Sequence, residues 1–348
     1  MKRKFRVLSL AAVLATVMLM ATGCSGGESG GTGSSGGSSS GGSTINLKFG
    51  HDNNTDGSYH AGALEFQRLV AEKTGGAVKI DIYPSAQLGD EATLLESVRM
   101  GTVDFATCGC SNAATVFPEL GLFSVSYLFK DQAHFDKCVA DDSPMIDRLK
   151  ELVADRNAGA RIGGLFTIGK RSVINKRGPI VTPDDLKGMK IRVMASPIET
   201  EVWTTLGALP TSIATAETYS ALESGVVEAA ENAPIIVYSW KFHEPAPYYS
   251  LTEHQFFLSP VFVSDKVAGK LGEYADTVME ALREAAVYER QADIKINEQA
   301  LKDLEAGGAK INNNVDKQAF MDKLASLQDK VAGQYNVQDL LEMIRAAA

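Results

Sequence analysis

A run of glycine and serine divides this chain of 348 residues into a short leader and one long remaining part. Residues 25–43 contain one Glu and one Thr besides Gly and Ser. Such a segment has no apolar side chains to bury, so it cannot form a core and is expected to act as a flexible spacer. About 300 residues follow it, which is enough for two lobes at the usual size of a domain.

The residues before this run predict export from the cytoplasm. Four cations precede the mostly apolar stretch 7–21, which is too short to span a bilayer comfortably. Gly23-Cys24 then resembles a bacterial lipobox, although Ala21 stands where such boxes usually carry leucine. We expect a signal peptide over 1–23, a lipidated Cys24, a spacer over 24–44 and an extracytoplasmic location. The alternative is a conventional signal peptide with a chance cysteine.

The charge of the chain argues against some partners. The formal net charge is −9, and it becomes about −13 once the four leader cations are removed. A nucleic acid is therefore an improbable partner. After the leader, no apolar run approaches membrane-spanning length, so a role in transport would need separate membrane subunits.

The three remaining cysteines do not indicate a disulfide framework. Cys108, Cys110 and Cys138 are odd in number, and a C-x-C pair forms only a strained disulfide. No second pair or histidine cluster lies at ligand spacing, so small buried or cavity-lining thiols are favoured over a zinc site. We expect neither a metal nor a cofactor.

The pattern after the spacer alternates strands and helices. Alternating apolar residues predict strands near 45–49, 78–82 and 103–105, with amphipathic helices around 63–70 and from Asp90 or Glu91 to Gly101. This β-α-β-α-β order is typical of a layered α/β lobe.

A second lobe repeats this order. Residues 189–194 predict a strand, a capping box at 196–199 starts a helix that ends at Gly207, and another helix ends at Gly225. The segments LESVRMGTVDFA and LESGVVEAA resemble each other, and Cys108 and Asn232 lie equally far beyond their glycines. Both residues are therefore expected at a crevice where the carboxyl ends of strands meet.

The end of the chain is expected to be helical. No Pro or Gly interrupts residues 273–306, whose apolar residues keep helical spacing. Such a helix would be about 50 Å long and could cross both lobes. Two further amphipathic helices are predicted at about 316–331 and 337–347.

Several ordered motifs resemble the solute receptors of tripartite ATP-independent periplasmic (TRAP) transporters. They are YPSAQLG at 83–89, DLKGMKIRV at 185–193, YSALESGVVE at 219–228 and the pair Glu231-Asn232. The resemblance spans roughly residues 45–310. It implies an α/β two-lobe clamshell with mixed sheets, bridged by the long helix, and an ion-gradient-driven membrane transporter as partner.

We also predict where the two lobes begin and end and the oligomeric state of the protein. Lobe I would comprise 45–168 plus about 257–297, and lobe II 169–256 plus about 298–348. The protein is expected to be a monomer.

Arginines lead the predicted binding residues. In the family, the arginine at the position of Arg192 pairs with the ligand carboxylate, and a planar guanidinium suits that bidentate role. Arg171 matches a second family arginine, although Lys170 beside it leaves a shift of one residue open. Asn232 matches a family amide that contacts the ligand, but Ala233 intervenes here before the proline.

The remaining predicted contacts depend more heavily on the resemblance. Asp52 and His51 follow the first strand, and Glu91 matches a carboxylate that can receive ligand hydroxyls or amines. His51 could equally cap a strand end, and Glu91 could only complement its helix N-terminus. Cys108 and Thr215 fall near cavity-lining positions, and Thr215 makes the cavity more polar than an aromatic residue would.

These features predict a receptor for a small carboxylate, with a sugar acid as the favoured ligand, and not an enzyme. The chain has no H-E-x-x-H motif and no phosphate-binding loop outside the spacer. His243 and His254 flank Glu244 and Glu253, but two intervening prolines break any helix that could align them. A receptor for an ATP-driven importer or a sensor kinase is the alternative.

Overall fold

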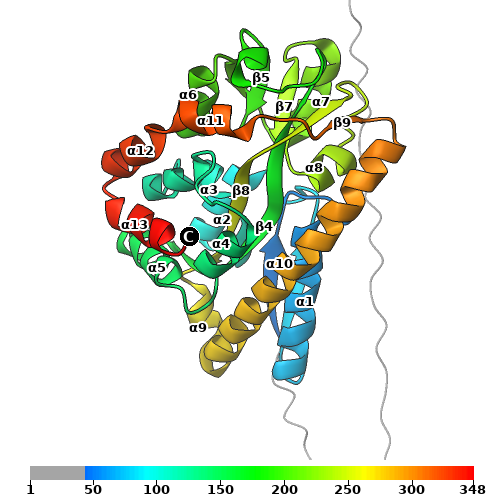
Figure 1. Ribbon diagram of the computed structural model, residues 1–348. Helices are drawn as coiled ribbons and strands as arrows, with labels where there is room; N and C mark the ends of the chain where they lie inside the picture. The colour runs from blue at the N-terminus through cyan, green and yellow to red at the C-terminus, as the bar shows by residue number, and fades with distance from the viewer. Residues whose placement is uncertain (1–43) are drawn as a thin grey trace, which may run out of the picture. The chain divides into compact units, whose positions relative to one another are not determined.

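The computed structural model describes residues 44–348 (Figure 1). The predicted signal peptide, Cys24 and the spacer up to Ser43 lie outside the described residues. Within 44–348 the strands form one nine-stranded mixed sheet, in the order β2-β1-β3-β8-β4-β7-β5-β6, with β9 paired to β8. The strands are β1 (Ile45–Gly50), β2 (Val78–Tyr83), β3 (Phe105–Thr107), β4 (Ala160–Asn175), β5 (Lys190–Val193), β6 (Leu209–Ser212), β7 (Ala229–Asn232), β8 (Tyr248–Ser264) and β9 (Lys310–Asn312).

Helices cover both faces of this sheet. They are α1 (Ser58–Lys73), α2 (Glu91–Met100), α3 (Cys110–Ala113), η1 (Pro118–Ser124), α4 (Gln132–Cys138), α5 (Pro144–Asp155), η2 (Pro183–Leu186), α6 (Pro197–Thr205), α7 (Thr215–Ser224), α8 (Pro234–Ser239), α9 (Val267–Leu271), η3 (Gly272–Tyr274), α10 (Ala275–Ala306), α11 (Lys317–Leu324), α12 (Leu327–Tyr335) and α13 (Gln338–Ala346). Here η marks a short 3₁₀ helix.

The predicted β-α-β-α-β order of the first part is confirmed. β1 pairs in parallel with both β2 and β3, and α1 and α2 make the connections. Asp90 caps α2 by accepting a hydrogen bond from the Thr93 amide, and Gly101 ends it at a φ of 75°. Glu91 thereby becomes the first residue of α2, directly beside the carboxyl end of the sheet.

The second part follows the same plan. β5 pairs in parallel with β6 and β7, and α7 ends at Gly225 with a φ of 77°. Ser196 caps α6 as predicted, by accepting a hydrogen bond from the Glu199 amide. The Glu199 carboxylate, however, accepts from the Met194 amide, so it secures the turn that follows β5.

Two long antiparallel strands join these parts, and the sequence did not predict them. β4 has 16 residues and β8 has 17, and they pair along almost their whole length. Most of their side chains are buried on both faces, so they lack the alternation of apolar and polar residues that marks a half-exposed strand. A register shift between Thr167 and Lys170 interrupts the pairing where the predicted lobe boundaries fall, and two further shifts lie between Ile162 and Gly164 and between Arg171 and Val173. The boundaries themselves stay a prediction.

The predicted long helix is confirmed as α10. It has 32 residues and packs against α1 at one end and α8 towards the other, as Figure 1 shows. Its axis comes close to α1 because Gly62 has no side chain: a Cβ there would lie 2.7 Å from both Glu289 Cγ and Phe166 Cζ.

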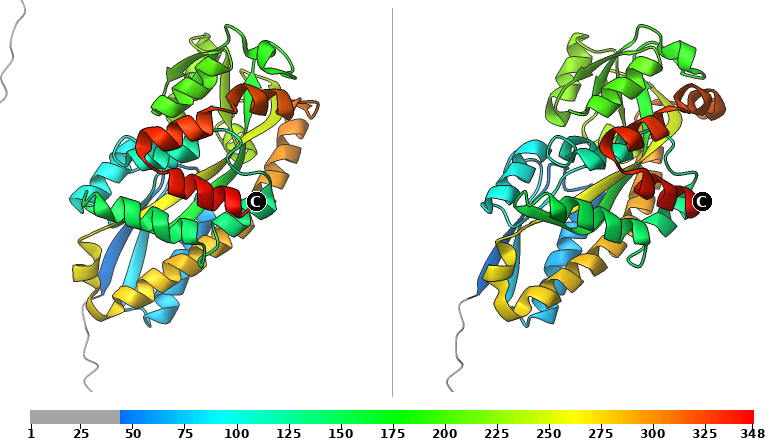
Figure 2. Two further views of the ribbon diagram at one scale, coloured as in Figure 1. Left: turned by 60° about the vertical axis from the view of Figure 1, so that its left-hand side comes forward. Right: turned by 90° about the vertical axis from the view of Figure 1, so that its left-hand side faces the viewer.

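The C-terminal segment differs from its prediction. Three helices, α11 to α13, replace the two expected, because the stretch predicted as one helix over 316–331 is broken between Leu324 and Leu327. α11 contacts α6, whereas α12 contacts η1 and α13 contacts α5 (Figure 2). The last two helices therefore pack on elements of the predicted lobe I, although the prediction placed residues 298–348 in lobe II. Burial of Val331, Leu340 and Ile344 holds them there.

Among residues 44–348, no helix is both long enough and apolar enough to cross a bilayer.

Candidate functional site

Two adjoining cavities lie where the carboxyl ends of β1, β5 and β7 meet. The larger has a volume of about 210 Å³ and is lined by Asp52, Asp90, Glu91, Ala92, Asn112, Arg192, Met194, Ala195, Ser212, Ile213, Ala214 and Thr215. The smaller, of about 20 Å³, shares four of these residues and adds Asn53, Tyr59, Ile168, Arg171, Asn232, Ile236 and Phe257. A site at the carboxyl ends of strands is the usual position of ligands in open α/β sheets.

Arg192 is the basic residue of the larger cavity. It projects from β5, opposite Thr211 of β6, and its side chain is 2% exposed. Nε donates to the Ile213 carbonyl at 2.7 Å and Nη2 to Thr215 Oγ1 at 3.3 Å. In the described part of the chain, Nη1 is buried without a hydrogen-bond partner. The guanidinium is thus fixed in orientation and still has a donor for an anion.

Arg171 has a different environment. Nε and Nη2 each bond a carboxylate oxygen of Glu231 at 2.5 Å, and Nη1 donates to Asn232 Oδ1 at 3.1 Å. The group also lies over the Phe257 ring, 4.8 Å from its centroid. Its charge is already compensated, although it lines the smaller cavity.

Glu231 is held ionised by these contacts. Burial alone would raise its pKa, but the Arg171 charge and hydrogen bonds from His254 and Arg171 outweigh burial and lower the pKa to about 2. His254 Nε2 lies 3.3 Å from Glu231 Oε2. Glu231 therefore completes a buried structural pair.

Two buried carboxyl groups line the larger cavity together with Arg192 and form what we call its acidic wall. Asp52 and Glu91 are 9% and 6% exposed. Burial, reinforced for Asp52 by the charge of Glu91, raises the pKa of both groups. Asn112 Nδ2 donates to Glu91 Oε2 at 2.6 Å, whereas Asp52 Oδ1 is buried without a partner among residues 44–348. These oxygens can receive hydroxyl groups of a ligand.

The structure brings six of the predicted site residues together. Arg192, Asp52, Glu91 and Thr215 line the larger cavity, and Arg171 and Asn232 line the smaller one. Their contact with a ligand stays a prediction.

His51 and Cys108 line neither cavity. His51 Nε2 lies 3.2 Å from His60 Nδ1, and burial together with repulsion from His60 lowers the pKa of His51 to about 3. Cys108 is fully buried among core residues, and like Cys110 and Cys138 it is a free thiol. The sequence predicts both residues at or near the crevice, but both side chains are buried in the protein interior.

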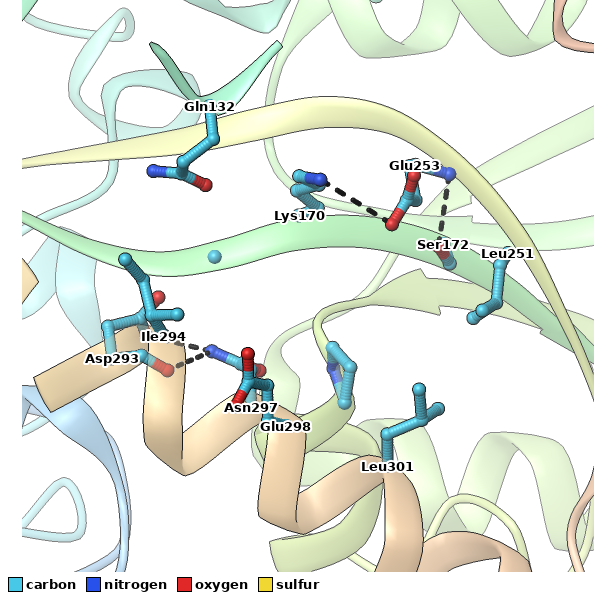
Figure 3. Close-up of a pocket in the computed structure, with 12 residues that line it drawn as sticks. Gln132, Lys170, Ser172, Leu251, Glu253, Asp293, Ile294, Asn297, Glu298 and Leu301 are labelled. Carbon is cyan, nitrogen blue, oxygen red and sulfur yellow. Dashed lines mark hydrogen bonds and ion pairs between the residues drawn. The ribbon is translucent and has the colours of Figure 1, made fainter. Parts of the chain in front are cut away.

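The side chains of Lys170 and Arg171 lie on opposite faces of β4. Successive side chains of a strand point to opposite faces. Lys170 lines a separate cavity of about 200 Å³ between β4, β8 and α10, where its Nζ lies 3.6 Å from Glu253 Oε1 (Figure 3). Of these two neighbouring residues, Arg171 is therefore the one that reaches the smaller cavity at the carboxyl ends of the strands.

Sequence reasoning missed several lining residues. Asn112, Tyr59 and Phe257 carry no motif, and Phe257 lies in the unpredicted β8. Asn112 could have been found, because it follows the carboxyl end of β3 by five residues, at the edge where the other site residues lie.

Comparisons with known proteins identify the family. Residues 49–334 match the model of the bacterial extracellular solute-binding protein family 7. The 2,3-diketo-L-gulonate-binding periplasmic protein YiaO of Escherichia coli K12 is 31% identical over 283 residues, which are 80% of this chain and 84% of the relative.

Solved structures that resemble this chain are also periplasmic solute-binding proteins. A TRAP periplasmic solute-binding protein of Roseobacter denitrificans, with bound β-D-glucuronate, has a TM-score of 0.81 and 27% identity, covering 86% of this chain and 99% of that one. A TRAP protein of Sulfitobacter sp. NAS-14.1, with bound β-D-galacturonate, gives the same values.

The family assignment settles the class of protein. The family model covers most of the chain, and the fold is that of a two-lobe periplasmic binding protein. The protein is extracytoplasmic, and the TRAP family implies that it works with membrane subunits. The chain belongs to bacterial extracellular solute-binding protein family 7, which comprises binding proteins of TRAP transporters.

Proposed function

We propose that the cavity beside Arg192 binds a sugar acid with one carboxylate, such as a hexuronate or an aldonate, for delivery to an ion-gradient-driven TRAP transporter. One observation carries this proposal: Arg192, held by two hydrogen bonds and with Nη1 unpaired among residues 44–348, lines the same cavity of about 210 Å³ as the buried carboxyl groups of Asp52 and Glu91. The arginine would pair with the ligand carboxylate, and Asp52 and Glu91 would receive its hydroxyls.

The acidic wall disfavours other organic acids. A dicarboxylate would bring two charges into a cavity whose lining, within the described part of the chain, contains Arg192 as its one basic residue, and ionised Asp52 or Glu91 would repel the second carboxylate. An apolar keto acid would leave Asp52 Oδ1, which has no partner among residues 44–348, without a hydrogen bond, at a cost of about 1–3 kcal/mol. The glucuronate and galacturonate bound by relatives of similar fold support the same choice.

Thermal-shift screening followed by titration calorimetry tests the ligand class. D-glucuronate, D-galacturonate and D-galactonate are expected to raise the melting temperature, and succinate and pyruvate are expected to leave it unchanged. A shift with succinate or pyruvate and none with the sugar acids would reject the proposal.

We also propose that Cys24 carries lipid and that the protein acts as a monomer. An anchor with a Gly/Ser spacer would keep the receptor near its membrane partner at high effective concentration and leave it free to turn. Mass spectrometry of the mature N-terminus tests the anchor, because an unmodified Cys24 or a different first residue would exclude it.

A further inference from the structure

Asn112 contacts both sides of the larger cavity. It lies in α3, after β3, and lines the cavity. Its Nδ2 donates to Glu91 Oε2 at 2.6 Å, and its Oδ1 accepts from the backbone amide of Ala195 at 3.2 Å. Ala195 follows β5, the strand of Arg192, and lies 83 residues further along the chain. One side chain therefore links the acidic wall to the segment that carries the arginine.

The backbone amide of Ala195 has Asn112 Oδ1 as its one hydrogen-bond acceptor among residues 44–348. Ala195 itself is exposed. An exposed amide with a single side-chain acceptor loses its protection against solvent exchange whenever that contact opens. The amide is thus a built-in reporter of whether the two sides of the cavity are joined.

We infer that Asn112 is a positioning residue that acts as a latch: it holds Glu91 toward the ligand and joins the Ala195 segment to the first lobe when the cavity closes. The inference rests on the proposed function for the identity of the ligand, but not for the contact between the two sides. In this proposal, a ligand bound to Arg192 leaves when the Ala195 segment moves away from α3, and this movement breaks the bond to Asn112 Oδ1.

The two bonds can be separated by substitution. Asn112→Ala removes both. Asn112→Asp keeps an oxygen that accepts from the Ala195 amide, but it can no longer donate to Glu91, and it places a second carboxylate beside the first. Asn313→Ala, at an exposed position that lines none of the cavities described above, is the matched control.

A neighbouring contact limits the risk that these variants fail to fold. Ser124 Oγ bonds Ser111 Oγ at 3.0 Å and Ser196 Oγ bonds Ser124 Oγ at 3.3 Å, so the same two segments stay connected beside Asn112. A circular dichroism melt of each variant confirms the fold before the other measurements.

Hydrogen exchange of the ligand-free protein tests the latch without any ligand. In Asn112→Ala the Ala195 amide should exchange at least about tenfold faster than in the wild type, since one net hydrogen bond is lost. Asn112→Asp and Asn313→Ala should stay within about threefold of the wild type. Unchanged exchange in Asn112→Ala would overturn the latch.

Stopped-flow release of D-glucuronate tests the effect on the ligand, with tryptophan fluorescence as the signal. Asn112→Ala should release it about tenfold faster, and Asn112→Asp should bind it at least about tenfold more weakly. Wild-type release rates in Asn112→Ala would overturn the latch, and wild-type affinity in Asn112→Asp would overturn the positioning of Glu91. A wild-type protein that binds no sugar acid would refute the proposed function alone, because the exchange experiment still decides on the latch.

Discussion

Two arginines of this protein are almost equally buried and have opposite surroundings. Arg171 is 1% exposed and Arg192 is 2% exposed. All three nitrogens of Arg171 donate to Glu231 or Asn232, and one carboxylate balances its charge at 2.5 Å. Arg192 has only a carbonyl and a hydroxyl as partners, and its Nη1 has none within residues 44–348.

The register of the sheet creates this difference. β4 pairs with β7 so that Val173 lies opposite Glu231 and Ser172 opposite Asn232, which places Arg171 beside its partners before any ligand is bound. β5 pairs Arg192 with Thr211 of β6, which carries no charge. A buried charge that the chain compensates itself contributes to the fold, whereas one that it leaves open can exchange water for a ligand anion.

The largest expected effect is a loss of stability when Arg171 loses the counter-charge of Glu231. Glu231→Gln would leave the Arg171 charge buried without a counter-charge and should lower the free energy of unfolding by about 3–5 kcal/mol. Urea denaturation measures the loss. Glu228→Gln is the matched control, since Glu228 pairs with Arg177 at 2.6 Å but both side chains are partly exposed; it should cost less than about 1 kcal/mol. Equal losses would show that Arg171 needs no counter-charge.

The pH dependence of stability also tests the pairing of Glu231 with Arg171. The pKa of Glu231 falls from 4.5 to about 2 in the folded protein, so its contribution is present above pH 4.5 and is lost as the pH falls towards 2. The difference in unfolding free energy between wild type and Glu231→Gln should shrink by about 3 kcal/mol between pH 5 and 2. Asp52 and Glu91 have raised pKa values and act in the opposite direction, but both proteins share them, so they cancel. A constant difference over this range would contradict the assignment.

A smaller effect is expected for Arg192, whose charge no carboxylate among residues 44–348 compensates directly. Its substitution should lower the affinity for the ligand and leave the stability of the fold nearly unchanged. Arg192→Lys keeps the charge but loses the planar fork, so D-glucuronate affinity should fall about 50-fold, or about 2 kcal/mol, in titration calorimetry. The free energy of unfolding should change by less than about 1 kcal/mol. Arg161→Lys, at a 45% exposed side chain paired with Asp265, is the control for both measurements. An unchanged dissociation constant would remove Arg192 from the site.

The sequence predicts the local parts of this fold better than their connection. Capped helices such as α2, strands with alternating apolar residues such as β1, and the uninterrupted α10 all depend on neighbouring residues, and they lie where expected. β4 and β8 are buried on both faces and pair with residues about 90 positions away, so no local pattern reveals them. The C-terminal helices likewise pack on α5 and η1 through contacts that only the tertiary structure defines.

The same limit applies to the site. The arginines and carboxylates could be named because they follow strands at one edge of the sheet, and six predicted residues line the two cavities. Their roles could not be derived in this way. From the sequence, Arg192 ranks first and Arg171 second, but both are expected to anchor the ligand. Only the pairing of β4 with β7 shows that Glu231 already compensates the charge of Arg171.

The smallest expected effect tests how Arg192 is held. Thr215 Oγ1 accepts from Nη2 of Arg192, and Val has the same shape without the hydroxyl. Thr215→Val should weaken D-glucuronate binding about fivefold, or about 1 kcal/mol, because the guanidinium loses one of the two contacts that orient it. Thr211→Val, at an exposed residue opposite Arg192 on β6, should leave affinity unchanged. If Thr215→Val binds D-glucuronate as tightly as the wild type, the hydrogen bond to the Ile213 carbonyl is sufficient to orient Arg192, and the Thr215 hydroxyl is not needed for this purpose.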